Sequence, residues 1–533
     1  MLKKIAVSAG LLLAMSGSRD ALAYEVQLEP FQDVGEKAWY ADYVYTLNAL
    51  GVIDGAGEGI FLPEETLTRE AFIKMLVTTA GIEGEEGEAV LPADAAGRWS
   101  TPYLAVALKR DWIDFLVDGK GDLKPGQPIT REEVASVMGR YLLDQSGTEV
   151  SSAWLQGGWN AEKTKHPFPD DSAIAPSLAP TVYYTVNQGV MEGDDGFRPR
   201  ALLKRSEAAA VVNRMMDKRA GQHPLQMTGF YAIQSFQAAN RMTALDQVVF
   251  GWSSLKYEGA GKGGLETRTG DYKLPDGAEL AVQAADKAGL AKDLMVYAAD
   301  RTKLSAFLKD AAAKESFLKE LKAQLDDPRF GYTGVCIDFE DMRNGEEAPG
   351  FVRFLQELKA GLPGKSLSVA VPPGYYYKGY DLQGIGASAD TVILMAYDFD
   401  HEASGLPSAP LPLVNETVQE ALKAVPAGKL VLGISKQANQ WLTEQGVTRL
   451  LEPAIDAVER RKADPATVSS FALPFFLNRL HDETGGRISD IYYEDTASIA
   501  KKIWLAKYYG LKGVSLWYMG SLTESDWELV SRK

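Results

Sequence analysis

An internal repeat in the first half of the 533-residue chain constrains its fold more than any other feature. Arg69, Arg131 and Arg205 each lie in a short run that reads Leu-Thr-Arg, Ile-Thr-Arg or Leu-Lys-Arg, followed by apolar residues at helical spacing. Each arginine follows an aspartate by 35 to 37 positions, and these aspartates are Asp33, Asp94 and Asp170. A unit of about 60 residues buries too little surface to be stable alone, so three copies are expected to pack together.

The repeat resembles the S-layer homology domain, whose opening aromatic-x-Asp is matched by Phe31 to Asp33 and by Phe168 to Asp170. The resemblance covers three copies, at residues 28–84, 88–150 and 164–218. It implies an α-helical pseudo-threefold bundle that binds pyruvylated secondary cell-wall polysaccharide. The implied contact residues are Asp33, Arg69, Asp94, Arg131, Asp170 and Arg205. An arginine fork suits a carboxylate of such a ligand, but the alternative is that these arginines begin helices and pair with neighbouring carboxylates.

The N-terminal residues 1–23 are typical of a secretion signal. Lys3 and Lys4 precede an apolar stretch of 11 residues, Ile5 to Met15, and Ala21 to Ala23 has the small-x-small pattern of a cleavage site. Eleven residues are too few to cross a bilayer, which takes about 20, and no transmembrane segment is expected. With the repeats, this predicts a secreted protein associated with the cell wall or S-layer of a bacterial surface. A buried N-terminal helix is the alternative.

Composition excludes several classes of function. The formal net charge of -16 makes a nucleic acid an unsuitable partner, because phosphate binding needs a concentrated basic face. Cys336 is the single cysteine, and the four histidines are scattered without the spacing of metal ligands. We therefore expect no metal, no cofactor and no internal disulfide.

A linker at 218–226 separates the repeats from a region where short β-branched or aromatic runs alternate with helical stretches such as 304–325 and 347–360. Strands are predicted near 228–232, 247–255, 293–298, 333–340, 366–372, 391–397, 429–435 and 513–518. Eight such strands favour a closed (β/α)8 TIM barrel over residues 228–533. The roughly 78 residues between the last two strands are predicted to hold an inserted subdomain.

The most informative strand end is the run from Gly334 to Glu340. Side chains alternate along a strand, so Cys336, Asp338 and Glu340 share one face, and the inward face of a barrel suits them. Two nearby carboxyls shift each other's pKa, so that one can keep a proton near neutral pH while the other is ionised, as a glycosidase requires. The alternative is a solvated pair at the rim.

Residues 228–533 resemble glycoside hydrolase family 18, the chitinase-like barrels, and especially their spore-cortex and cell-wall branch. The Asp-Gly-x-Asp/Asn-x-Asp-x-Glu motif is matched by 333–340, and Met-x-Tyr-Asp by 395–398. The Pro-rich loop 404–412, the triplet 493–495, the helix 499–508 and the strand 513–517 are similar to that branch.

The resemblance implies substrate-assisted hydrolysis with retention of configuration. Glu340 would protonate the glycosidic oxygen, Asp338 would orient the substrate's acetamido group, and Tyr397 would donate a hydrogen bond to its oxygen. Asp398 would line the same subsite, and Trp517 would form its apolar floor.

Trp252, at the end of the second strand, is a further candidate for stacking on a sugar, with core packing as the alternative. Thr333 and Cys336 depart from the family motif where acidic residues or Asn are usual, which predicts a slower enzyme. The Gly-x-Gly-x-x-Gly run at 259–264 lacks the following helix that a dinucleotide site needs, and it is predicted to form a flexible rim loop.

The sequence therefore predicts a wall-anchored glycosidase that acts on β-1,4-linked glycans containing N-acetylglucosamine. Peptidoglycan is favoured over chitin because the anchor would place the barrel at the wall. Two alternatives stay open. The barrel could bind carbohydrate without hydrolysing it, or it could serve as a structural component of the surface layer.

Overall fold

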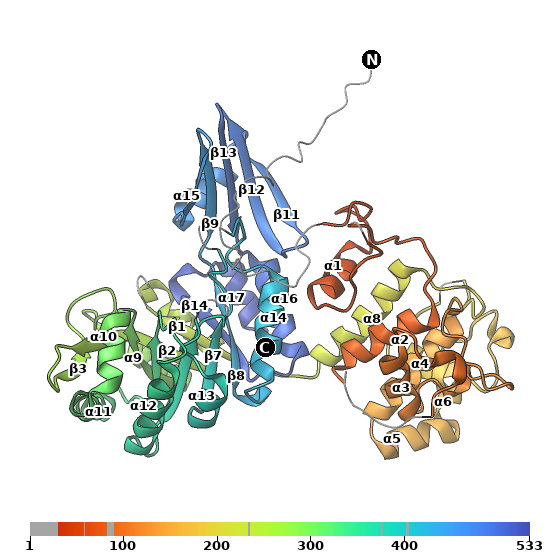
Figure 1. Cartoon of the computed structure of the whole chain (residues 1–533), viewed down its shortest axis with the longest axis horizontal. Helices are drawn as coiled ribbons and strands as arrows, with labels where there is room; N and C mark the ends of the chain where they lie inside the picture. Colours follow the sequence, from red (N-terminus) through yellow and green to blue (C-terminus); the bar gives the residue numbers. More distant parts are fainter. Residues whose placement is uncertain are drawn as a thin grey trace.

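The computed structural model describes residues 30–57, 59–82, 90–193, 195–232, 235–374, 377–400 and 404–532. The predicted secretion signal at 1–23 lies outside these residues. The described chain forms a helical bundle, a barrel, and a small sheet that stands above the barrel (Figure 1). No helix within those ranges is long and apolar enough to span a membrane.

The bundle is built from three pairs of helices, one pair for each sequence repeat (Figure 1). The pairs are α1 (Ala41–Ala49) with α2 (Arg69–Ala80), α3 (Thr101–Lys109) with α4 (Arg131–Gln145), and α7 (Ala179–Asn187) with α8 (Arg205–Ala220). Thr68 and Thr130 cap α2 and α4 by accepting hydrogen bonds from backbone N–H groups in the first turn. Isolated β-bridges join Thr66 to Lys204, Thr68 to Pro128 and Thr130 to Leu202. The three repeats are thus closed into a ring.

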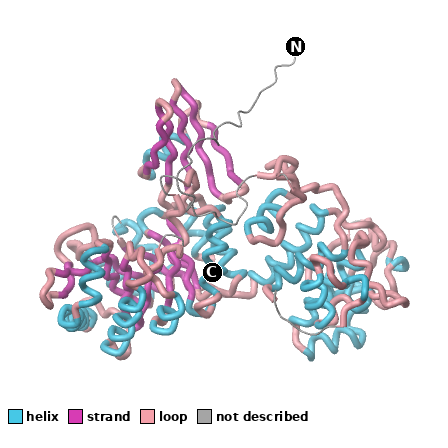
Figure 2. Tube along the Cα trace, in the orientation of Figure 1, coloured by secondary structure: helices cyan, strands magenta, loops and turns pink. Residues whose placement is uncertain are grey.

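The second half forms a closed barrel of parallel strands surrounded by helices, as the sequence predicts (Figure 2). Its strands are β1 (Gln226–Tyr231), β2 (Gln247–Tyr257), β4 (Ala291–Ala298), β5 (Gly334–Phe339), β6 (Ser366–Val371), β7 (Thr391–Met395), β8 (Leu430–Ser435) and β14 (Gly513–Trp517). Pairing of β1 with both β14 and β2 closes the ring. The outer helices include α9 (Ala278–Ala288), α12 (Ala348–Gly361), α13 (Leu382–Ser388), α14 (Leu411–Leu422), α16 (Thr496–Tyr508) and α17 (Glu524–Val530).

Two details of the barrel differ from the sequence prediction. The helix predicted at 304–325 is two helices, α10 (Arg301–Lys309) and α11 (Ala311–Leu325). They separate at Asp310, which is extended and caps α11 by accepting a hydrogen bond from the Ala313 N–H. The glycine-rich run at 259–264 was predicted as a loop, but its end belongs to β3 (Gly263–Glu266), which pairs antiparallel with β2.

The predicted insertion between the last two barrel strands is a five-stranded antiparallel sheet with one helix, which projects from the barrel (Figure 1). Its elements are β9 (Asn439–Glu444), β10 (Val447–Leu451), α15 (Ile455–Lys462), β11 (Val468–Ala472), β12 (Leu477–Thr484) and β13 (Arg487–Tyr493). The strand order is β10-β9-β13-β12-β11. Because β9 follows β8 almost directly, the insertion starts at the carboxyl end of the barrel, where reactive groups of such folds lie.

The bundle contacts α16 of the barrel through α2 and α8. The Tyr508 hydroxyl donates to the Thr79 carbonyl at 2.6 Å, and the Trp504 indole N–H donates to Asp217 at 2.8 Å. The Arg219 guanidinium lies 5.0 Å from the centre of the Tyr508 ring. Polar and aromatic contacts therefore fix α8 against the barrel.

Candidate active site

Two carboxyl groups lie at the carboxyl end of β5, where the sequence predicts them. Asp338 is within the strand and only 4% exposed, and Glu340 follows the last strand residue. Cys336 belongs to the apolar cluster inside the barrel, together with Met295 and Ile393. Alternation along the strand then directs Asp338 to the same interior, one layer closer to the mouth.

Burial changes the protonation of both groups. It raises the pKa of Glu340 to about 7, with a further contribution from the charge of Asp398, while a hydrogen bond from Tyr297 acts in the opposite direction. Burial, and then repulsion by Glu340, raise the pKa of Asp338 well above its usual range. Two desolvated carboxyls that repel each other do not both ionise readily, so the pair keeps a proton near neutral pH.

Asp338 also has an unused hydrogen-bond acceptor. Its Oδ1 atom is buried and has no hydrogen-bond partner among the residues that the structure describes. Leaving such an oxygen unpaired costs free energy unless another group supplies a donor. The arrangement suits a ligand that carries an N–H or O–H group into the barrel mouth.

Tyr397 and Asp398 follow β7. Burial, with repulsion from Asp398, raises the pKa of Tyr397 well above its usual range, so its hydroxyl stays protonated and can donate. The Asp398 N–H donates to Ser408 Oγ at 3.1 Å, and the Ser408 N–H donates to Asn439 Oδ1 at 3.0 Å. Desolvation by neighbouring groups raises the pKa of Asp398 to about 6, although the residue is exposed to solvent. The Pro-rich loop and the first strand of the insertion thus hold Asp398 in place.

An aromatic group borders the carboxyls. Trp517, at the end of β14, lies 5.4 Å from Phe230 and 6.3 Å from Tyr272 between ring centres. Tyr272 lies 4.5 Å from Tyr297, which bonds Glu340. Motif reasoning identified Trp517 but missed Tyr272 and Tyr297, since neither lies in a motif and only the fold brings them to the mouth.

The prediction that Trp252 contacts substrate is wrong. Its side chain is 3% exposed and stacks on Phe250 with ring centres 4.0 Å apart, in the core between the strands and the outer helices. A Cβ on the intervening Gly251 would meet the Met295 side chain, which lies inside the barrel. Alternation therefore directs Phe250 and Trp252 outward, which is the core-packing alternative.

The two departures from the motif have different settings. Thr333 lies at the opposite end of β5 from Glu340, where its hydroxyl accepts a hydrogen bond from the Lys292 N–H at 2.7 Å. Cys336 is fully buried next to Asp338, and burial raises the pKa of its thiol well above the usual range. Cys336 is therefore a neutral, weakly polar neighbour of Asp338.

A cavity of about 550 Å³ opens between the barrel mouth and the insertion. Trp517 and Tyr518 line it from the barrel side, and Glu452 and Asp456 line it from the insertion. Its volume is in the range of cavities that bind small ligands. Within the described ranges, no group of three or more His, Cys, Asp or Glu side chains is arranged as metal ligands are.

In the bundle, each predicted aspartate accepts two hydrogen bonds from backbone N–H groups of the turn before the long helix of its repeat, at 2.6 to 3.0 Å. The pairs are Asp33 with Phe61 and Leu62, Asp94 with Leu123 and Lys124, and Asp170 with Phe197 and Arg198. In each pair the second residue has a positive φ, a backbone conformation that these bonds help to hold.

Each predicted arginine donates to a backbone carbonyl in the corresponding turn of another repeat. The bonds are Arg69 to Leu123 at 2.7 Å, Arg131 to Phe197 at 3.0 Å, and Arg205 to Phe61 at 2.7 Å. Arg69 also pairs with Glu133, which agrees with the alternative that the arginines pair with nearby carboxylates. The three arginines thus link different repeats, whereas the three aspartates each hold a turn within their own repeat. Contact of these six residues with polysaccharide stays a prediction.

A closed (β/α)8 barrel with one buried carboxyl, one half-buried carboxyl and a half-buried tyrosine at the carboxyl ends of its strands has the features of a glycoside hydrolase barrel. The family comparison makes this specific, because residues 285–521 match the model for glycosyl hydrolases family 18. Residues 30–73 and 167–209 match the S-layer homology domain. The chain therefore joins S-layer homology domains to a family 18 glycoside hydrolase domain. These matches leave out the repeat at 88–150, whose Asp94 and Arg131 make the same contacts as their counterparts.

Two relatives from Bacillus subtilis match the chain. One is YdhD, provisionally named a sporulation-specific glycosylase, which is 30% identical over 37% of this chain and 50% of its own length. The other is a cortical fragment-lytic enzyme, 27% identical over 42% of this chain and 54% of its own length. The chain thus spans about half the length of these curated relatives. The crystal structure of a chitinase from Chromobacterium violaceum shares the barrel fold, with a TM-score of 0.50 and 20% identity over 58% of this chain and 98% of that one.

Proposed function

We propose that the protein is a cell-wall-anchored, retaining glycosidase that hydrolyses β-1,4-linked glycans containing N-acetylglucosamine. The observation that carries this proposal is the pair formed by the buried Asp338 and the half-buried Glu340 at the barrel mouth. The pKa of Glu340, raised to about 7, supplies a proton donor at neutral pH. A general acid of this kind is what cleavage of a glycosidic bond requires.

In the first step, Glu340 gives its proton to the glycosidic oxygen as the bond between that oxygen and the anomeric carbon breaks. The carbonyl oxygen of the substrate's own 2-acetamido group forms a bond to the same carbon, which gives a cyclic oxazolinium ion. In the second step, water attacks this carbon, Glu340 takes up the proton of the water, and the acetamide is restored. Two displacements at one carbon retain its configuration.

Asp338 and Tyr397 act on the acetamido group. The buried Oδ1 of Asp338 accepts the amide N–H, and the negative charge of Asp338 stabilises the positive charge of the oxazolinium ion. The protonated hydroxyl of Tyr397 donates to the acetamido oxygen and orients it. Asp398 lines the same subsite, and Trp517 packs against the apolar face of the sugar ring.

Peptidoglycan is the favoured substrate and chitin the second. The S-layer homology domains support an attachment to cell-wall polysaccharide, which would keep the barrel next to peptidoglycan. The name of the cortical fragment-lytic relative points to the same class of wall glycan. A secreted protein at the bacterial surface agrees with both.

The test is hydrolysis by the full chain of purified peptidoglycan and of soluble chitin oligosaccharides, with the products identified by mass. Glu340→Gln is expected to abolish release of reducing ends while leaving the melting temperature at or above that of the parent. Glu346→Gln, in the same loop but exposed, is the matched control and should retain full activity. Activity in Glu340→Gln would refute the assignment of the acid.

The comparison of substrates separates the remaining possibilities. Cleavage of peptidoglycan alone supports the favoured substrate, whereas cleavage of chitin oligosaccharides alone contradicts it. Binding of either glycan with no product after prolonged incubation would overturn the hydrolase proposal in favour of a carbohydrate-binding barrel, for which the neutral Cys336 beside Asp338 is the supporting observation.

A further inference from the structure

The strands that carry Glu340 and Trp517 lie on opposite sides of the barrel mouth. In the closed ring of eight strands, β5 and β14 are four strands apart in either direction. In the proposed reaction Glu340 gives its proton to the oxygen of the leaving sugar, whereas Trp517 packs against the sugar that stays in the site. The leaving sugar therefore extends towards the loops that follow β5 and its neighbour β6.

These two loops pack together and carry two exposed cations, Arg343 and Lys378. The Gly379 N–H, from the loop after β6, donates to the Met342 carbonyl of the loop after β5 at 3.0 Å. The guanidinium carbon of Arg343 lies 5.7 Å from the centre of the Tyr377 ring. Both cations thus belong to one edge of the mouth, which we call the cationic edge.

Both cations keep hydrogen-bond donors that no described residue accepts. Arg343 donates through Nε to Asp341, but its two Nη groups have no acceptor among the described residues, and its side chain is 58% exposed. Lys378 donates to the Gly374 carbonyl at 2.9 Å and has no carboxylate partner in the described part of the chain. An arginine fork and a neighbouring ammonium suit a carboxylate ligand.

Tyr377 places the cationic edge close to the reacting groups. Burial raises the pKa of its hydroxyl, and the positive charge of Arg343 opposes that rise. The charges of Asp341, Glu340 and Asp398 then add to it. Because such interactions weaken with distance, Tyr377 lies near both the catalytic acid and Arg343.

The opposite side of the mouth is unsuited to a carboxylate. Glu452 and Asp456 line the cavity there, and neither has a cationic partner among the residues that the structure describes. Lys436 lines the same cavity, but it forms an ion pair with the buried Asp526 at 2.5 Å. A sugar that carries a carboxylate is therefore favoured on the leaving side and disfavoured on the side of β14.

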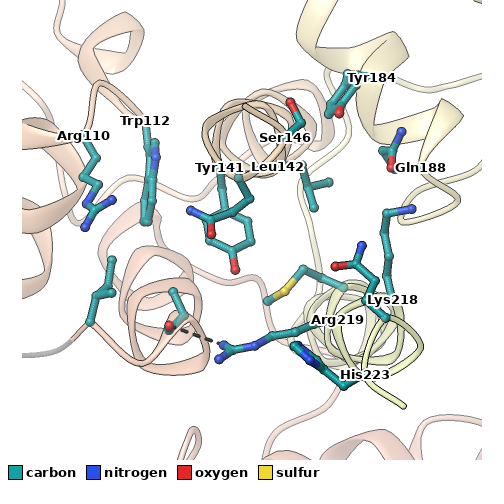
Figure 3. A pocket seen from close by; sticks show the side chains of 15 residues that line it. Arg110, Trp112, Tyr141, Leu142, Ser146, Tyr184, Gln188, Lys218, Arg219 and His223 are labelled. Carbon is teal, nitrogen blue, oxygen red and sulfur yellow. Dashed lines mark hydrogen bonds between the residues drawn. The ribbon is translucent and has the colours of Figure 1, made fainter. Parts of the chain in front are cut away.

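The helical bundle shows by contrast how an arginine is held when it has a structural role. Arg219 borders a cavity of about 460 Å³ in the bundle (Figure 3). It donates to the carbonyls of Thr79 and Ala80 at 3.2 and 3.4 Å, and so offsets the partial negative charge at the end of α2. The cationic edge differs because its cations keep donors that no described residue accepts.

We propose that Arg343 and Lys378 select a glycan whose leaving sugar carries a carboxylate, as N-acetylmuramic acid does on its lactyl group or on the peptide attached to that group. The lactyl group is bonded to carbon 3, next to the oxygen that receives the proton of Glu340, so its carboxylate reaches the cationic edge. The inference rests on the proposed hydrolase function and deepens it, because it supplies a reason in this chain for favouring peptidoglycan over chitin.

The test compares two soluble tetrasaccharides of alternating N-acetylglucosamine and N-acetylmuramic acid, one with free lactyl carboxyls and one with these converted to methylamides. The full chain should cleave the acid form with a kcat/KM at least tenfold higher, mainly through a lower KM, and the difference should shrink as salt is raised. New reducing ends, identified by mass, should be N-acetylglucosamine. Equal kcat/KM for the two forms, or new reducing ends on muramic acid, would overturn the proposal.

Variants assign the preference to the two cations. Arg343→Gln combined with Lys378→Gln should lower kcat/KM on the acid form about tenfold, to the value of the amide form. Arg268→Gln combined with Lys319→Gln removes the same two types of charge at exposed positions elsewhere on the barrel and should keep the preference. A preference that survives in the first double variant would refute the role of the cationic edge.

Binding separates this inference from the hydrolase proposal. Glu340→Gln, which lacks the acid, is titrated calorimetrically with both tetrasaccharides, and the acid form should bind about tenfold more tightly. Tighter binding of the acid form without cleavage by the parent would leave the cationic edge in place and contradict the hydrolase proposal. Equal affinities would refute the cationic edge even if the parent cleaves both glycans.

Discussion

Charged groups are buried in both halves of the molecule, but their hydrogen bonding differs. In the bundle, Asp94 accepts two backbone hydrogen bonds and Arg131 donates to two backbone carbonyls. At the barrel mouth, Asp338 has a buried oxygen that no described residue bonds, and desolvation shifts Glu340 towards its protonated form. The first pattern is that of groups that stabilise a fold, and the second is that of groups whose partners arrive with a substrate.

The difference also concerns repetition. The bundle uses the same aspartate contact three times, each time to hold a backbone turn with positive φ. In the barrel, the acidic pair Asp338 and Glu340 occurs at the end of β5 and is not repeated at the other strands of the ring that the structure describes. A contact that recurs in every repeat indicates a structural role. A single acidic pair, with a buried oxygen that no described residue bonds, indicates a role in binding or catalysis.

The largest expected effect is loss of activity in Asp338→Ala. Removing the charge that stabilises the oxazolinium ion should lower kcat on a soluble chitin oligosaccharide about 10³-fold. The melting temperature should stay within a few degrees of the parent or rise, because the variant removes a buried carboxyl oxygen that has no partner within the described ranges. Rates and thermal unfolding are measured on the same samples. A large fall in melting temperature would mean that Asp338 is structural, like Asp94.

The bundle should respond in the opposite way. Asp94→Ala removes two hydrogen bonds to a carboxylate and should lower the free energy of unfolding by about 2 kcal/mol. The melting temperature of the bundle should fall by several degrees, with kcat on the soluble oligosaccharide unchanged. Asp195→Ala, at an exposed position of the same bundle, is the control and should change neither. Reduced kcat in Asp94→Ala would contradict the separation of the two halves.

The sequence predicted the features that depend on local pattern. The barrel strands are runs of buried apolar residues, and the inward direction of Asp338 follows from alternation along one strand. The repeat unit of the bundle could be recognised because the sequence contains three copies to compare. A single copy would not have stood out. The insertion was predicted because the segment between the last two barrel strands is too long to be one connecting helix.

The remaining features depend on distant parts of the chain. Tyr297 bonds Glu340 from a neighbouring strand, and Tyr272 approaches from the loop between β3 and α9, with no motif to identify either. Asn439 bonds Ser408 because the insertion begins at the barrel mouth, next to the loop that follows β7. Trp252 was assigned to the site by its place near a strand end, but strand alternation directs it to the outer core.

A smaller effect is expected from the hydrogen bond between Tyr297 and Glu340, which lowers the pKa of Glu340 against the effect of burial. In Tyr297→Phe this bond is lost, the pKa of Glu340 rises, and the acid keeps its proton to higher pH. The basic limb of the rate-against-pH curve, near pH 7 in the parent, should move upward, with kcat at pH 6 within about threefold. Tyr272→Phe keeps that bond and should leave the limb in place. A downward shift in Tyr297→Phe would reverse the assigned role.

The smallest effect concerns Cys336, whose thiol is a weak hydrogen-bond partner for Asp338 and which is fully buried in the barrel interior. Cys336→Asn places an amide donor beside Asp338, where the family motif has Asp or Asn, and should raise kcat a few-fold because Asp338 is oriented more firmly. The variant should also lose some stability, since an amide replaces a small apolar group among apolar neighbours. Cys336→Ala alters packing without adding a donor and should leave kcat near the parent value. Equal kcat for the Asn variant and the parent would show that Cys336 only fills space, and the unpaired oxygen of Asp338 would then depend on the substrate alone.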